Sequence, residues 1–162
     1  SIRRDVMTNA NPKLKRDIKL TRLIDAPREA VFKAWTDPRQ LAKWWGPEHF
    51  TNPVCEIDLR VGGTLYIVMR SPDGSDYPMK GVYREIIPGE KLAFTNIAVN
   101  LQGNHQLEGF TTVTFADENG KTRLTVVTGA VGLVPAAEQM LEGMEAGWEQ
   151  TIDGLENFLA KK

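Results

Sequence analysis

The apolar residues change their spacing near Pro135, and this change most constrains how the chain can fold. Before Pro135, short apolar segments are separated by turn residues. In Cys55–Val61, for example, apolar and charged residues alternate strictly, which predicts a strand with one buried face and one solvated face. After Pro135, apolar residues recur every three or four positions, which predicts one long amphipathic helix. Its apolar stripe consists of Leu141, Met144, Trp148, Ile152, Leu155 and Leu159.

Turn and capping residues divide the rest of the chain into short elements. Residues 17–25 predict a first strand. Pro27 and the pair Asp37-Pro38 predict the starts of two short helices, because proline suits the first helical turn and aspartate caps its free N–H groups. Gly46 ends the second helix. Further strands are predicted over residues 55–61, 64–70, 77–87, 91–99, 109–116 and 121–128.

Short turns join these strands, and short turns favour antiparallel pairing. Gly62-Gly63 and Asn119-Gly120 are two such hairpin signals. A sheet with one apolar face must cover that face, and the last helix is the only long amphipathic element available. We therefore predict an α+β fold in which a curved antiparallel sheet of about six to seven strands wraps around a long C-terminal helix.

Charge is unevenly distributed along the chain. The 162 residues have a net charge of −1, but residues 1–16 carry +4 and residues 17–162 carry −5. We expect residues 1–16 to form a flexible basic arm and residues 17–162 to form a single domain. The near-neutral total excludes a global basic field, so we expect no nucleic-acid partner.

Few residues suit metal or redox chemistry. With one cysteine, no intramolecular disulfide can form, and His49, His105 and Cys55 are far apart in sequence. We expect no metal, no cofactor and no catalytic residue, and we interpret both histidines as surface residues. No stretch approaches the ~18 apolar residues of a membrane span, so a cytoplasmic protein is the default expectation.

Several segments carry a family likeness. Residues 22–47 (RLIDAPREAVFKAWTDPRQLAKWWGP) resemble the opening of the activator of heat-shock-protein-90 ATPase homologue family. The likeness continues through residues 55–63, 81–86 and 88–95 and ends around Gly147-Trp148 on the last helix. This family belongs to the START-like (SRPBCC) superfamily, which includes polyketide cyclases. The resemblance implies the helix-grip fold, in agreement with the architecture predicted from the residues.

The family resemblance leaves the function open. Its stand-alone bacterial-type members resemble hydrophobic-ligand binders or stress-associated proteins. The eukaryotic co-chaperone carries this domain behind a separate chaperone-binding domain, for which we expect no room in this chain.

A bent sheet and a helix can enclose a cavity for an apolar molecule. Methionine and aromatic side chains on the inward stripe suit its wall, while Asn96 and threonines could orient a ligand. The alternative is that these side chains fill a solid core, and the parity of the strand residues is open. The predicted cavity residues are Phe32, Trp35, Tyr66, Met69, Tyr83, Phe94, Asn96, Phe110, Thr112, Thr128, Met140, Met144 and Trp148.

The leading hypothesis is a protein that binds a small hydrophobic ligand between the last helix and the sheet. One alternative is a chaperone-associated stress-response interaction module. Another is a polyketide-cyclase-like or hydrolase-like enzyme that uses Tyr83, Asn96 or a histidine as acid–base groups. The scarcity of histidine and cysteine favours binding over catalysis. The expected partners are an apolar or amphipathic small molecule and, besides it, a chaperone or a second copy of the chain.

Two further features lie on the last helix. Gly143, Gly147 and Gly154 each cost ~1 kcal/mol against alanine, which suggests a close backbone approach or a bend. Acidic residues form a second stripe, which is either a docking face for a basic partner or, as we favour, the solvated back of the helix. This stripe consists of Glu138, Glu142, Glu145, Glu149, Asp153 and Glu156.

Overall fold

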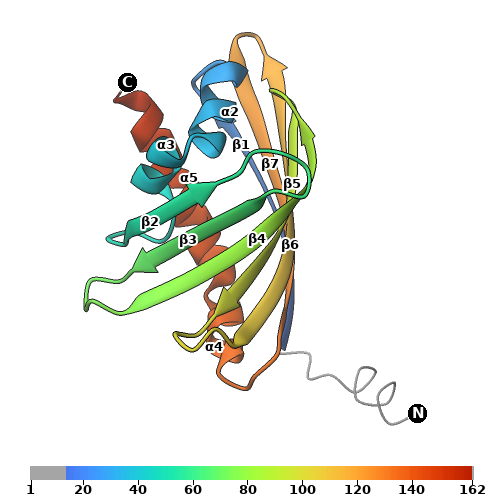
Figure 1. Cartoon of the computed structure of the whole chain (residues 1–162). Coiled ribbons are helices and arrows are strands. Elements are labelled where there is room, and N and C mark those ends of the chain that lie inside the picture. Colours follow the sequence, from blue (N-terminus) through green and yellow to red (C-terminus); the bar gives the residue numbers. More distant parts are fainter. Residues whose placement is uncertain (1–13, 162) are drawn as a thin grey trace.

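The computed structural model describes residues 14–161, which form seven strands and four helices (Figure 1). In chain order these are β1 (Lys15–Ile24), α2 (Arg28–Thr36), α3 (Pro38–Trp44), β2 (Thr51–Ile57), β3 (Thr64–Arg70), β4 (Asp76–Ile87), β5 (Lys91–Val99), β6 (His105–Glu118), β7 (Lys121–Gly132), α4 (Ala137–Glu142) and α5 (Met144–Ala160).

One sheet contains all seven strands in the order β1-β7-β6-β5-β4-β3-β2, and each neighbouring pair is antiparallel. Strands β2 to β7 follow one another as a meander, and β1 adds to the far side of β7. The sheet curves around α5, while α2 and α3 lie over the same face at one end (Figure 1). The predicted α+β class, the wrapped sheet and the two short helices after the first strand are confirmed.

The bounds of some elements differ from those predicted. Strand β6 begins at His105 rather than at residue 109, because its first residues pair with the ends of β5 and β7. The predicted continuous last helix is divided at Gly143, whose φ of −85° and ψ of −2° separate α4 from α5. Strand β1 begins at Lys15 within the predicted basic arm, and residues 1–13 of that arm lie outside the described residues.

The corner between α2 and α3 follows from its capping residues. Asp37 ends α2 and begins α3, where its side chain accepts a 2.9 Å hydrogen bond from the backbone N–H of Arg39. Pro38 occupies the first helical turn. This tight corner brings Trp35 and Trp44 together with ring centroids 4.9 Å apart, and Trp44 Nε1 donates to the carbonyl of Ala34.

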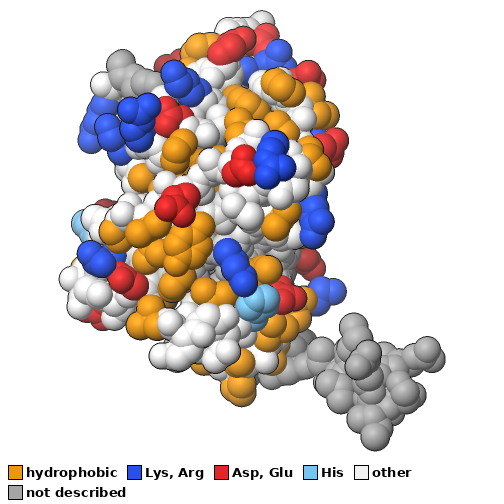
Figure 2. Space-filling view, in the orientation of Figure 1, with side chains coloured by type: hydrophobic (Ala, Val, Ile, Leu, Met, Phe, Trp, Pro, Cys, Tyr) orange, Lys and Arg blue, Asp and Glu red, His pale blue; other side chains and the backbone are white. Residues whose placement is uncertain are grey.

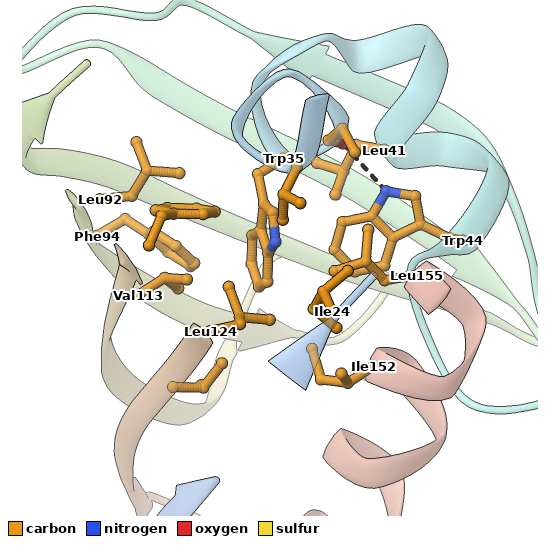
Figure 3. Packing of buried hydrophobic residues seen from close by; sticks show 14 of the residues in the cluster. Ile24, Trp35, Leu41, Trp44, Leu92, Phe94, Val113, Leu124, Ile152 and Leu155 are labelled. Carbon is orange, nitrogen blue, oxygen red and sulfur yellow. Dashed lines mark hydrogen bonds between the residues drawn. The ribbon is translucent and has the colours of Figure 1, made fainter. Parts of the chain in front are cut away.

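The hydrophobic core fills the space between the sheet, α2, α3 and the C-terminal half of α5 (Figure 3). Trp35 lies at its centre and is only 2% exposed. From α5, Ile152 and Leu155 enter this core and are fully buried. The core therefore joins α2, α3 and α5 to the sheet.

Ion pairs between β1 and α5 fasten the helix to one edge of the sheet. Arg16 donates to Glu145 at 2.9 Å, and Arg22 donates to Glu156 at 2.7 Å and to Asp153 at 2.5 Å. Part of the predicted acidic stripe therefore lies against basic residues of the same chain, which neither earlier interpretation of the stripe included.

Candidate functional site

The inner face of the sheet, which faces α5, has two different halves along the strands. In the packed half, the inward side chains of β5, β6 and β7 are large, apolar and buried. They are Leu92, Phe94, Val113, Phe115, Leu124 and Val126. In the open half, the inward positions of the same strands carry Ala98, Leu107 and Ala130, two of which have the small side chain of alanine.

A cleft of about 390 Å³ lies between this open half and the helices α4 and α5. It is lined by Trp45, Gly46, Pro47, Phe50, Met69, Tyr77, Pro78, Met79, Asn96, Ala98, Leu107, Ala130, Gln139, Met140, Gly143, Met144, Gly147, Trp148 and Thr151. None of these residues carries a formal charge.

Methionines form facing walls of the cleft. Met140 and Met144 come from the helical side, and Met69 and Met79 come from β3 and β4. Methionine has an unbranched, flexible side chain that adapts to irregular shapes. The cleft can therefore fit its wall to more than one apolar shape.

Glycines keep the helical wall open. A Cβ atom built on Gly147 would meet no atom within 4 Å, so the position faces empty space. At Gly154, in contrast, a Cβ atom would lie 2.9 Å from the backbone oxygen of Trp44. The close approach expected from the sequence is therefore found at Gly154, where α5 packs on α3, while Gly143 marks the break between the helices.

An aromatic partition separates the cleft from the core. The ring of Trp148 stacks on Trp35 with centroids 6.4 Å apart and meets Trp45 edge to face at 5.4 Å. Trp148 and Trp45 line the cleft, whereas Trp35 belongs to the core.

A row of polar side chains marks the boundary between the two halves of the sheet. Thr128 of β7, Thr111 of β6 and Asn96 of β5 follow one another across the strands. The Oγ1 atoms of Thr128 and Thr111 are 2.8 Å apart, and Thr111 Oγ1 donates to Asn96 Oδ1 at 2.8 Å. Both threonines are buried, and Asn96 ends the row in the cleft wall.

The structure brings some of the predicted cavity residues together. Those that line the cleft are Met69, Asn96, Met140, Met144 and Trp148. Thr128 points inward but is 2% exposed and reaches the cleft only through the polar row.

A second group of predicted residues lies in the core. Trp35, Tyr83 and Phe94 are at most 2% exposed and belong to the hydrophobic cluster. Phe32 packs against that cluster and meets Phe115 with ring centroids 5.2 Å apart. For these four residues the solid-core alternative describes their position.

A third group of predicted residues lies on the outer face of the sheet and not in the cleft. In β6 the buried residues are Thr111 and Val113, so Phe110 and Thr112 point outward. In β3 the most deeply buried residues, Leu65 and Ile67, have the parity of Met69, and Tyr66 points outward. Successive side chains of a strand alternate between faces, so an error of one position moves a residue to the opposite side.

Several residues of the cleft wall were not predicted from the sequence. Met79 and Tyr77 have the same inward parity as Tyr83, and Ala98 has that of Asn96, so parity could have identified them. Trp45 and Phe50 flank the Gly46-Pro47 corner, and no spacing pattern places that corner over the sheet.

Of the candidate acid–base groups, Asn96 lines the cleft, whereas Tyr83 and both histidines lie outside it. The side chain of His49 is 76% exposed, and His105 lies 2.8 Å from Glu108. Burial raises the pKa of the Tyr83 phenol above its ordinary value. Burial also raises the pKa of the Cys55 thiol to about 11, with smaller contributions from Asp37 and Glu56. Both groups therefore hold their protons at neutral pH.

A family model described as Activator of Hsp90 ATPase homolog 1-like protein matches residues 25–160. A search of curated proteins finds no match. No helix within residues 14–161 is both long and apolar enough to cross a membrane.

Solved bacterial structures have the same fold. Protein CV1439 from Chromobacterium violaceum is 29% identical, with a TM-score of 0.73 over 87% of this chain and 94% of that one. Protein NE0264 from Nitrosomonas europaea is 26% identical, with a TM-score of 0.71 over 93% of this chain and 97% of that one. The AHSA1 protein from Silicibacter pomeroyi is 24% identical, with a TM-score of 0.73 over 90% of this chain and 98% of that one.

Proposed function

Because the chain belongs to the family of Activator of Hsp90 ATPase homolog 1-like proteins, we propose that it binds a small hydrophobic molecule in the cleft between α5 and the open half of its helix-grip sheet. The observation that carries the proposal is the wall of the cleft. It combines methionine side chains from the sheet and the helices with the rings of Trp45 and Trp148, and it contains no charged residue.

The driving force is the removal of apolar surface from water. Each square ångström of apolar surface that a ligand buries stabilises the complex by about 25 cal/mol, before the entropy lost on binding is subtracted. Flat indole rings of Trp45 and Trp148 supply area for an aromatic or aliphatic body. The methionines adjust to its outline.

The experiment uses the neutral fluorescent compound N-phenyl-1-naphthylamine as the probe. The occluding variant is Gly147→Leu, because position 147 faces empty space in the cleft. The matched control is Ala146→Leu, which adds a leucine to the neighbouring exposed position of the same helix. Circular dichroism checks that both variants are folded.

We expect the wild-type protein and Ala146→Leu to bind the probe with similar Kd values, and Gly147→Leu to bind it at least tenfold more weakly. Equal affinity in all three proteins, or no binding to the wild-type protein, would contradict the proposal. The cyclase-like and chaperone-associated alternatives stay predictions from the family resemblance.

A further inference from the structure

We propose that the cleft selects neutral molecules that carry a carbonyl-type oxygen, and that the side-chain amide of Asn96 is the donor that holds this oxygen. The inference rests on the proposed function and adds a ligand class to it. Its basis is the polar row of Thr128, Thr111 and Asn96, together with the absence of charge from the cleft wall.

The polar row has a fixed direction. A threonine hydroxyl has one proton, and that of Thr111 is donated to Asn96 Oδ1. The contact between Thr111 and Thr128 therefore takes its proton from Thr128. Both threonines are buried, so water does not compete for these bonds. The row thus engages the oxygen of the Asn96 amide and leaves its nitrogen as the outer end.

The nitrogen of this amide is available for a ligand. Among residues 14–161 we find no acceptor bonded to Asn96 Nδ2. Nor is Nδ2 among the fully buried side-chain atoms that lack a partner, so the atom is accessible. Opposite Asn96 on β6 stands Gly109, where a Cβ atom would lie only 2.7 Å from Nδ2. Gly109 therefore leaves room for the amide in this orientation.

The wall of the cleft disfavours an anionic ligand. An ionised carboxylate that leaves water needs a cation or several donors, and no lysine, arginine or histidine lines the cleft. Arg70, which follows the lining residue Met69 on β3, is not part of the lining and is bonded to Asp76. A ketone, ester or amide oxygen has no such cost and needs one donor.

Other polar groups of the cleft are less suited to this role. Tyr77 is 44% exposed, and Gln139 is also exposed, so both meet water at the rim. The hydroxyl of Thr151 donates to the carbonyl of Gly147 and has only acceptor capacity left. Asn96 lies on the sheet, so its carbonyl partner would direct the apolar body of a ligand toward Met144 and Trp148.

The experiment compares three naphthalene compounds of similar shape, each measured by displacement of N-phenyl-1-naphthylamine. The ketone is 2-acetonaphthone, the apolar analogue is 2-ethylnaphthalene, and the anion is 2-naphthoate. The quantity of interest is the ratio of the Kd for the ketone to the Kd for the apolar analogue. This ratio cancels general effects of a substitution on the shape of the cleft.

The variants are Asn96→Leu, which removes the donor, and Asn96→Asp, which removes the donor but keeps an acceptor for Thr111. Thr128→Val tests the direction of the row, because Thr128 is a positioning residue outside the cleft wall. Thr125→Val is the matched control on the outward side of β7, where Thr125 faces Thr21.

In both Asn96 variants we expect the ratio to shift against the ketone by about three- to tenfold, as the loss of one hydrogen bond predicts. Thr128→Val should shift it in the same direction by a smaller factor, and Thr125→Val should not shift it. Wild-type protein should bind 2-naphthoate at least tenfold more weakly than the ketone.

Three outcomes overturn different statements. If 2-ethylnaphthalene and the fluorescent probe do not bind at all, the proposed function itself fails. If they bind, but the ratio is the same in the wild-type protein and in both Asn96 variants, the role of Asn96 is wrong and the proposed function stands. Equal affinity for 2-naphthoate and the ketone would overturn the selection for neutral ligands.

Discussion

The packed half and the open half of the inner sheet face lie on the same strands and under the same helix, yet only the first is filled by side chains. On β7 the inward residues change from Leu124 and Val126 to Ala130 beyond the polar row. On the helical side, Ile152 and Leu155 fill the packed half, whereas Gly147 faces the cleft. Small inward side chains on the sheet and a glycine on the helix therefore leave a space between elements that are closely packed further along.

The cover of the two halves also differs. Helices α2 and α3 close the packed half with Trp35 and Trp44 (Figure 3). The short helix α4 and the loop around Gly46 border the open half. On the molecular surface, hydrophobic side chains form separate groups among Lys, Arg, Asp and Glu side chains (Figure 2).

Truncation of one large side chain in each half should give the greatest difference in the free energy of unfolding. We expect Phe94→Ala, in the packed half, to lower the free energy of unfolding by about 3–5 kcal/mol, because it leaves a cavity in a filled core. Met140→Ala, at the 40% exposed rim of the cleft, should lower it by less than about 1 kcal/mol. Urea unfolding followed by circular dichroism measures both values. Similar losses would mean that the open half is packed in solution.

Substitution by alanine at two glycines of α5 should change the stability of the protein in opposite directions. Gly154→Ala should destabilise the protein by about 1–3 kcal/mol, because the added methyl group would press on the backbone oxygen of Trp44. Gly147→Ala should stabilise it by up to ~1 kcal/mol, since alanine favours the helix and the methyl group meets nothing. Thermal unfolding compares the two Tm values. Destabilisation by Gly147→Ala would show that this position is not open.

The ion pairs that fasten α5 to β1 should also contribute differently to stability beside the two halves. Arg22, whose side chain is 22% exposed, bonds to two carboxylates beside the packed half. We expect Arg22→Gln to cost about 1 kcal/mol and Arg16→Gln, at a more exposed single pair, less than about 0.5 kcal/mol. Unfolding at low and at high salt gives both values, and salt should reduce the difference. A larger loss at Arg16 would contradict this order.

Cys55, which packs against the core, should give a small pH dependence of the free energy of unfolding. Its pKa rises from 9.0 to about 11 on folding, so the folded protein keeps this proton at pH values where the unfolded chain loses it. Stability from this group is therefore complete below about pH 9 and is lost as pH rises toward about 11. Because the thiol is only partly buried, solvent screening reduces the effect below about 1 kcal/mol.

The control for this effect is Cys55→Ala, which should make unfolding less dependent on pH between about 9 and 11. An unchanged slope would assign the loss of stability to other groups, such as the buried phenol of Tyr83, whose pKa is also raised.

Periodicity predicted most of the fold, because the repeat of side chains along a helix or strand reflects which side faces the core. The alternation in Cys55–Val61 correctly indicated that Cys55 and Ile57 face inward. The strand predicted from this alternation extends too far, because β2 ends at Ile57 and Val61 is 62% exposed in the following turn. A pattern of alternating residues cannot show where the partner strand ends.

The candidate site was less predictable than the fold. The helix stripe pointed to Met144 and Trp148, because a helix has one inward face and its residues follow from spacing. Phe94 and Asn96 share a strand and a face, yet one lies in the core and the other in the cleft wall. The two residues differ in their position along the strand. Whether a position lies in the core or in the cleft depends on which helix covers it, and this is a tertiary property that spacing does not show.

All four tryptophans of the chain belong to one set of ring contacts that runs from the cleft into the core. Electronic transitions of aromatic rings at these distances couple, so the near-ultraviolet signals of the four indoles are not independent. The near-ultraviolet circular dichroism of the protein should therefore be strong and should respond as one signal. A molecule that touches Trp148 or Trp45 would alter the optical spectrum of indoles that it never contacts, and the protein carries its own optical reporter of occupancy.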